Sequence, residues 1–149
     1  MAQMDYRKTV RSNVTAKDAY NTIANVSDWW TTSFKGKAMN LNDTFSVTFG
    51  ETKVNFKVIE ANLYTRLVWE VTDCYLHWLA NKTEWTGSKI VWNISEDKIA
   101  TNIEMTHVGL VPGIECYKDC EAGWNQYVGE SLPSLLAGGK GLTFERSKR

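Results

Sequence analysis

The sequence lacks several features that would assign it at once to a class of protein. No stretch is long and apolar enough to span a membrane, and the first residues, M-A-Q-M-D-Y-R-K, contain no signal-peptide core. Lysine plus arginine number 17, as do aspartate plus glutamate, and no basic stripe stands out. Because phosphate binding needs a local cationic excess, a nucleic-acid partner is disfavoured. A nucleophile elbow, a phosphate-binding loop and a zinc-protease motif are also missing.

Cysteine is scarce as well, with three residues, an odd number, and no secretion signal. We therefore expect reduced thiols and a cytoplasmic location. Cys116 and Cys120 lie four residues apart on one face of a predicted helix, where a disulfide within one turn has poor geometry. With His107 or His77 they resemble a zinc site, but structural zinc prefers four ligands and Cys-x-x-Cys spacing. We predict no metal and no cofactor.

Aromatic residues are abundant by contrast: seven tryptophans, six tyrosines and five phenylalanines. Hydrophobic residues make up 43% and charged residues 23%, which is typical of a soluble globular protein. A chain of 149 residues favours one domain, 1–149, with a sizeable core. The aromatic side chains must therefore line either that core or a pocket.

The run from Pro112 to Gly141 is the one long stretch with helical spacing. About twenty-four helical residues would be roughly 36 Å long, enough to cross a small domain. Pro133 removes one backbone hydrogen bond and its ring presses on the carbonyl of Gly129, so we predict a kink there. The apolar positions recur every three or four residues: Cys116, Cys120, Trp124, Tyr127, Val128, Ser131, Leu132, Leu135 and Leu136.

Upstream of this helix, apolar and polar residues alternate with a period of two, as in strands. We predict a first strand Asp5–Val14, a helix Ala16–Asn25 with Thr15 as its N-cap, and a second short helix capped by Ser27. A meander of strands follows: Thr44–Phe49, Lys53–Ala61, Arg66–Thr72, the less regular Asp73–Trp85, Ser88–Ser95 and Ile99–Val108. The predicted fold class is therefore α+β, with a curved antiparallel sheet of six to seven strands wrapped around the long C-terminal helix.

Short motifs spaced along nearly the whole chain are specific as a set. They are Trp29-Trp30 with Phe34-x-Gly36, Asp43-x-Phe45, Phe49-Gly50, Trp69-x-Val71, Glu84-Trp85-x-Gly87, Thr106-His107-x-Gly109-Leu110, and Cys120 with Gly123-Trp124 and Ser131-Leu132. With them the sequence resembles the START-like (SRPBCC) superfamily and, within it, bacterial homologues of the activator of heat-shock-protein-90 ATPase. The resemblance implies a helix-grip fold. Its relatives include lipid carriers, hormone-binding proteins, polyketide cyclases and co-chaperone domains, so it implies no single function.

Inward-facing positions of the strands and the long helix supply the candidates for a ligand-binding cavity. Strand parity directs His107 toward the helix, in register with the apolar positions of its strand. Glu84 shares a side with the next strand unless Gly87 makes a bulge. The candidate cavity-lining residues are Trp69, Glu84, Trp92, Met105, His107, Cys120, Trp124 and Tyr127.

Two of these residues, and Trp78 outside this set, leave alternatives open. His107 is either a buried structural histidine, bonded to a carbonyl or to Glu84, or a ligand contact, or a catalytic acid or base. Glu84 is either a pocket carboxylate or a solvated one. Trp78 lies outside a regular strand and is either a lid or partner contact or packed under a loop.

Three functions follow from these observations. The first is a noncatalytic protein that holds a small apolar, aromatic or lipid-like ligand between sheet and helix. The second is a co-chaperone-like interaction domain, which the resemblance implies together with a role in stress response. The third is a cyclase or hydrolase type of enzyme that uses His107 with Glu84, and it ranks last. We assign no catalytic residue, and the oligomeric state stays open.

Overall fold

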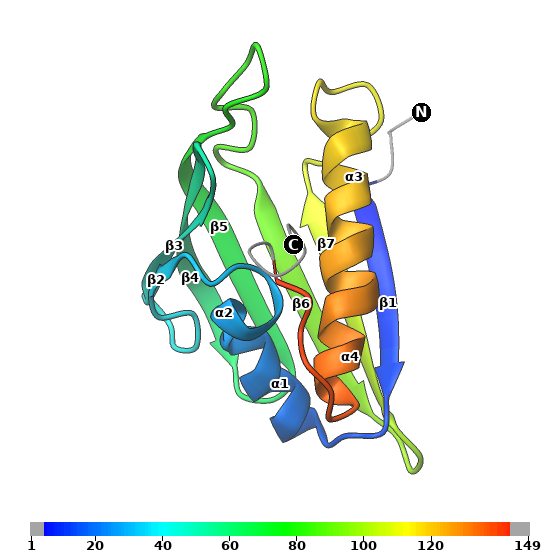
Figure 1. The fold of residues 1–149 in the computed structure, drawn as a ribbon. Coiled ribbons are helices and arrows are strands. Elements are labelled where there is room, and N and C mark those ends of the chain that lie inside the picture. Colours follow the sequence, from blue (N-terminus) through cyan, green and yellow to red (C-terminus); the bar gives the residue numbers. More distant parts are fainter. Residues whose placement is uncertain (1–4, 144–149) are drawn as a thin grey trace.

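Seven strands form one antiparallel sheet in a computed structural model that describes residues 5–143 (Figure 1). The strands lie in the order β1-β7-β6-β5-β4-β3-β2, and each pair of neighbours is antiparallel. Their bounds are β1 Tyr6–Ser12, β2 Phe34–Gly36, β3 Thr44–Phe49, β4 Thr52–Asn62, β5 Arg66–Tyr75, β6 Lys89–Glu96 and β7 Thr101–Val108. The short edge strand β2 was not predicted, because three residues carry too little alternation to stand out.

Helices pack against one face of this sheet. The C-terminal helical segment consists of α3 (Tyr117–Gln126), a π-helical turn η1 (Tyr127–Ser131) and α4 (Leu132–Leu136). It lies alongside β1, while α1 (Ala16–Ala24) contacts β6, β7 and α4 (Figure 1). The short helix α2 is Val26–Trp29. This arrangement confirms the predicted α+β fold, a curved sheet wrapped around a long C-terminal helix.

The first helix forms for the reasons read from its sequence. The Thr15 hydroxyl accepts a hydrogen bond from the Asp18 amide at 3.1 Å, so Thr15 caps the helix as predicted. Its buried face consists of Ala19, Tyr20, Ile23 and Ala24. The second helix differs from the prediction, because it begins after Asn25 and has no side-chain cap.

Regular α-helical bonding is interrupted where Pro133 was expected to disturb it. The amide of Leu132 bonds to the carbonyl of Tyr127, five residues earlier, so the helix widens into a π-turn before the proline. A π-turn accommodates the missing amide of Pro133 without ending the helix. The disturbance is therefore a change of hydrogen-bond register within a continuing helix.

Large aromatic side chains fill the space between sheet and helices. Trp69 and Trp92 are fully buried, with ring centroids 5.5 Å apart. Trp29 meets Trp92 edge to face at 5.6 Å, and Phe45 meets Trp69 in the same way at 5.0 Å. Such contacts add about 0.5–1.5 kcal/mol each beyond the burial of apolar area. The centre of the grip is therefore a packed core.

None of the helices among residues 5–143 combines the length and the apolar character that crossing a membrane would require.

Candidate functional site

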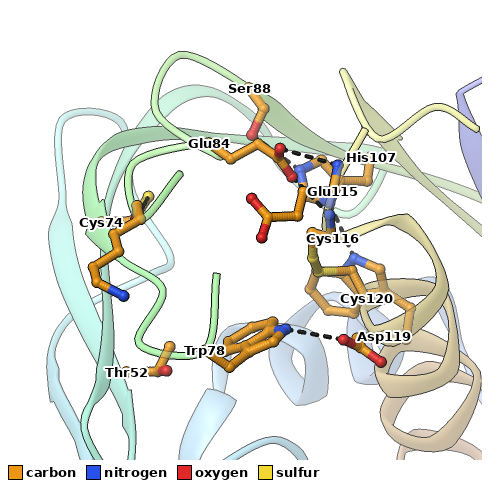
Figure 2. Close-up of a disulfide and its surroundings, with 12 residues drawn as sticks. Thr52, Cys74, Trp78, Glu84, Ser88, His107, Glu115, Cys116, Asp119 and Cys120 are labelled. Carbon is orange, nitrogen blue, oxygen red and sulfur yellow. Dashed lines mark hydrogen bonds between the residues drawn. A yellow bond between two sulfur atoms is a disulfide. The ribbon is translucent and has the colours of Figure 1, made fainter. Parts of the chain in front are cut away.

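An apolar pocket of about 210 Å³ lies near the start of α3. Six aromatic residues and two polar side chains, Thr52 and Asp119, contribute to its wall. The loop 76–88 between β5 and β6 forms one side, the end of β3 and the start of β4 another, and α3 a third (Figure 2). The lining residues are Trp30, Phe49, Thr52, Val54, Leu76, Trp78, Trp85, Asp119, Cys120, Gly123, Trp124 and Tyr127.

The loop 76–88 is organised around Lys82. Its ammonium group donates to the carbonyls of His77 at 2.7 Å and Leu79 at 2.8 Å, and its own carbonyl accepts from the Leu76 amide at 2.7 Å. These bonds replace the sheet partners that the backbone lost when it left β5. The loop is therefore a folded structure, and it presents Leu76, Trp78 and Trp85 to the pocket.

Two carboxylates tie this loop to the start of α3. Glu115 accepts from the amides of Ala80 at 2.7 Å and Asn81 at 3.0 Å. In the opposite direction, Glu84 accepts from the amides of Glu115 at 3.1 Å and Cys116 at 2.8 Å (Figure 2). Hydrogen bonds from Asn81 and then Ala80 lower the pKa of Glu115. We call these four hydrogen bonds the carboxylate clasp. The two bonds to Glu84 also give acceptors to backbone amides just before α3, a helix with no capping side chain of its own.

Trp78 lies at the mouth of the pocket. Its indole nitrogen donates to Oδ2 of Asp119 at 3.0 Å, which links the loop to the first turn of α3 (Figure 2). The residue is nevertheless 47% exposed. A tryptophan that both lines a pocket and faces solvent lies where a ligand would enter, so the lid interpretation of Trp78 fits this geometry better than packing under a loop.

His107 is buried behind the pocket wall and has a definite tautomer. The indole N–H of Trp124 can only donate, so Nδ1 of His107, 3.0 Å away, is the acceptor. The proton is therefore on Nε2, which donates to the hydroxyl of Ser88 at 2.9 Å, and Ser88 donates to the carbonyl of Trp85 at 2.6 Å. Burial lowers the pKa of His107 to about 3. The neutral ring thus positions Trp124 and Trp85, two tryptophans of the pocket wall.

The pairing of His107 with Glu84, one of the alternatives left open for these residues, is not formed. Both ring nitrogens of His107 are bonded to Ser88 and Trp124, and both oxygens of Glu84 accept backbone amides of the clasp. Neither ring nitrogen of His107 is left for a direct bond to the Glu84 carboxylate. The acid–base mechanism drawn from these two residues therefore has no geometric basis.

The two cysteines at the start of α3 form a disulfide, so the prediction of thiols is wrong (Figure 2). The predicted helix included both residues, but α3 begins at Tyr117 and Cys116 precedes it. The Cα atoms of Cys116 and Cys120 are 5.6 Å apart, which lies within the range of protein disulfides. Cys74 is free and buried. Among residues 5–143 no group of three or more His, Cys, Asp or Glu side chains is placed to hold a metal ion.

Comparison with solved structures identifies the fold. The Aha1 dimer from Colwellia psychrerythraea superposes with a TM-score of 0.75 at 19% identity, over 95% of this chain and 100% of that one. CalU16 from Micromonospora echinospora superposes with a TM-score of 0.64 at 13% identity, over 95% of this chain and 78% of that one. This chain has the START-like helix-grip fold. No protein-family model matches the sequence, and no curated protein is similar to it in sequence.

A third START-like structure is DynU16, a protein from the dynemicin biosynthetic locus. It superposes with a TM-score of 0.65 at 16% identity, over 93% of this chain. The chain spans 49% of the length of DynU16. Identities this low establish the shared START-like fold alone, since unrelated functions are built on one fold.

Within this START-like fold, three of the candidate cavity-lining residues line the pocket: Cys120, Trp124 and Tyr127. All three lie on the C-terminal helical segment, whose inner face was clear from its 3.6-residue period. Most of the remaining wall comes from strands and loops that are distant in sequence, where local periodicity offers no comparable signal, while Asp119 and Gly123 of α3 lie outside the apolar pattern of the helix. The lining residues missing from the candidate set are Trp30, Phe49, Thr52, Val54, Leu76, Trp78, Trp85, Asp119 and Gly123.

The other five candidates lie outside the lining. Trp69, Trp92 and Met105 are fully buried in the packed core. His107 stands behind Trp124, and Glu84 holds the loop to the start of α3. Strand parity predicted the inward direction of Trp69, Trp92, Met105 and His107 correctly, but direction does not reveal whether neighbouring side chains fill the space ahead.

Proposed function

We propose that this pocket binds a small apolar molecule with one or two aromatic rings, or a short acyl chain. The observation that carries the proposal is a pocket of about 210 Å³ with six aromatic residues and only two polar side chains in its wall. A buried apolar cavity of about 150 Å³ accepts a benzene molecule, so the volume here suits a slightly larger ligand. A complete membrane lipid would not fit.

The construction of the pocket supports the same proposal. Its wall is held in place before any ligand arrives, by the clasp on one side and by the hydrogen bonds of His107 on the other. A preformed wall reduces the ordering cost of binding. Convergent aromatic surface with few polar groups is also what small-molecule sites present.

The tryptophan indole groups provide a direct test. Four tryptophans line the pocket, namely Trp30, Trp78, Trp85 and Trp124, and three do not. We expect 2-naphthol, added to ¹⁵N-labelled protein, to shift the indole N–H signals of the four lining residues in a saturable way. The signals of Trp29, Trp69 and Trp92 are internal controls and are expected to move little. Absence of saturable shifts with a panel of one- and two-ring compounds would remove the proposal.

A protein-interaction role is the second candidate. Trp78 and Tyr75 are 47% and 46% exposed, and both lie at the end of the sheet where the loop 76–88 begins. Exposed aromatic residues close together are typical of contact surfaces. The resemblance noted in the sequence suggests a chaperone of the heat-shock-90 class as partner. Titration with the bacterial chaperone tests this: no binding and no change in its ATPase rate would exclude the role.

A further inference from the structure

We infer that the ligand of this pocket carries a positive charge, as in a quaternary ammonium group attached to an aromatic or short aliphatic body. The inference rests on the proposed function and specifies the class of ligand. It comes from the combination of tryptophan rings with a single carboxylate in the wall, Asp119.

The tryptophan rings of the wall favour a cationic ligand. The face of an indole attracts a cation more strongly than the face of any other natural side chain, and several rings around one space act together. Trp30, Trp85 and Trp124 form a contiguous group, with centroids 4.8 Å apart for Trp30 and Trp124 and 6.0 Å for Trp85 and Trp124. Trp78 adds a fourth indole at the mouth, and Phe49 and Tyr127 complete the aromatic wall.

The charge of the wall also favours a cationic ligand. Among residues 5–143, Asp119 is the only acidic residue in the lining, and no lysine, arginine or histidine of this range lines the pocket. The bond from Trp78 occupies Oδ2 of Asp119 and leaves the negative charge in place at the mouth. An anionic ligand would therefore meet a carboxylate with no opposing cation in the wall, whereas a cationic ligand would meet a charge of opposite sign.

Charges outside the wall do not reverse this sign. The N-terminal end of α3 contributes roughly half a positive charge. Three carboxylates, those of Glu84, Glu115 and Asp119, lie around that end and outweigh it. The Lys82 ammonium keeps its charge while it donates to two carbonyls of the loop, and it offsets one of these carboxylates, which leaves the excess negative. Lys118 is exposed and lies outside the lining.

The test compares two ligands of nearly the same shape, phenyltrimethylammonium and its neutral isostere tert-butylbenzene. Titrations follow the indole N–H signals of Trp30, Trp78, Trp85 and Trp124. We expect the cation to bind about tenfold more tightly at low salt, because cation–π attraction and Asp119 act only on the charged ligand. In Asp119→Asn, which retains an oxygen for Trp78, the cation should lose most of that advantage while tert-butylbenzene binds as before.

Glu130→Gln is the matched control, since Glu130 is exposed on the same helical segment and does not line the pocket. This variant should bind both ligands as the wild type does. Equal or tighter binding of tert-butylbenzene to the wild type overturns the inference and leaves the proposed function standing. A preference for the cation that persists undiminished in Asp119→Asn supports the cationic ligand and assigns its recognition to the indole rings, which overturns the part given to Asp119. If neither compound moves the lining signals, the proposed function fails as well.

Discussion

His107 shows how one buried side chain fixes the positions of several others. Its neutral ring accepts from Trp124 and donates to Ser88, and Ser88 in turn holds the carbonyl of Trp85. A protonated ring would present a second N–H to the indole N–H of Trp124, with no acceptor between them. The neutral tautomer of His107 with its proton on Nε2 is therefore required for the hydrogen bonds that hold Trp124 and Trp85 in the pocket wall.

Protonation of His107 should consequently oppose folding. Its pKa is about 3 in the folded protein and 6.5 in the unfolded chain, so the unfolded state binds more protons between these values. The contribution of His107 to the free energy of unfolding therefore has its full value above about pH 6.5 and falls as the pH decreases. We expect a loss of about 2 kcal/mol between about pH 7.5 and pH 5, at about 1.4 kcal/mol per pH unit.

Urea unfolding at several pH values measures this loss. His107→Gln is the control, because its amide offers one acceptor and one donor but does not titrate. Its stability should depend less on pH over the same range. Asp97 and Glu115 have lowered pKa values, so each adds to the free energy of unfolding at neutral pH. That contribution is lost only as the pH falls below their unfolded pKa values of 3.8 and 4.5. Parallel pH profiles for the two proteins would contradict the assigned role.

The disulfide between Cys116 and Cys120 can be tested by counting the reactive thiols of the protein. Three cysteines less the two that are paired leave one thiol, that of Cys74. Protein denatured without reductant should therefore react with one equivalent of a thiol reagent, and with three after reduction. Cys74→Ser should react with none before reduction. Three equivalents in the unreduced protein would show that Cys116 and Cys120 are not joined.

At the scale of the elements, the clasp explains how an irregular loop becomes a pocket wall. The loop 76–88 has no sheet partner over most of its length. Glu115 supplies acceptors to it from the neighbouring helix start, and Glu84 of the loop accepts two amides of that start in return. Glu115 is exposed and Glu84 is partly exposed, so the clasp adds little to the free energy of unfolding of the whole protein. Its main effect is to hold the loop 76–88 in position.

Removal of the clasp should loosen the loop without unfolding the protein. In Glu115→Ala the amides of Ala80 and Asn81 lose their acceptor, so their hydrogen exchange should become several-fold faster than in the wild type. Amides of β6 and β7 should exchange as before. Glu130→Ala, which removes an exposed carboxylate of η1, serves as the control. Unchanged exchange at both loop amides would mean that the clasp does not hold the loop.

The loop and the start of α3 also mark the limit of what the sequence could predict. Period-two and 3.6-residue patterns predicted the strands to within a few residues and the inner face of the long helix. They failed between Asp73 and Trp85, where the backbone follows Lys82 and contacts Glu115, about thirty residues away. Local patterns carry no information about partners that far apart, so the clasp and most of the pocket wall could not be found.

For the whole molecule, the main difference from expectation is the location of free space. Strand parity predicted a hollow at the centre of the grip, but Trp69, Trp92 and Met105 fill that region. The free space lies instead at one end of the sheet, where the loop 76–88 and α3 meet. Parity indicates on which side a residue lies, whereas the size of its neighbours decides whether a cavity remains.

Two glycines should respond in opposite ways to a single methyl group. At Gly141, which follows the C-terminal helical segment, an added Cβ would collide with the carbonyl oxygen of Asp28 in α2. Gly141→Ala should therefore lower the free energy of unfolding by about 1–3 kcal/mol. At Gly123, in α3, an added Cβ meets no atom within 4 Å. Gly123→Ala should raise the free energy of unfolding by about 0.5–1 kcal/mol, and urea titration of both variants measures the contrast.

Filling the pocket from Gly123 tests the central claim most directly. Gly123→Leu extends a side chain from α3 into a space lined by Trp124, and Gly123→Ala is the small-side-chain control. The measurement is the affinity for 2-naphthol from the indole N–H shifts. We expect that Gly123→Ala still binds 2-naphthol, while Gly123→Leu remains folded and loses binding by at least about tenfold. Unchanged affinity in Gly123→Leu would contradict it, because the ligand would then bind elsewhere.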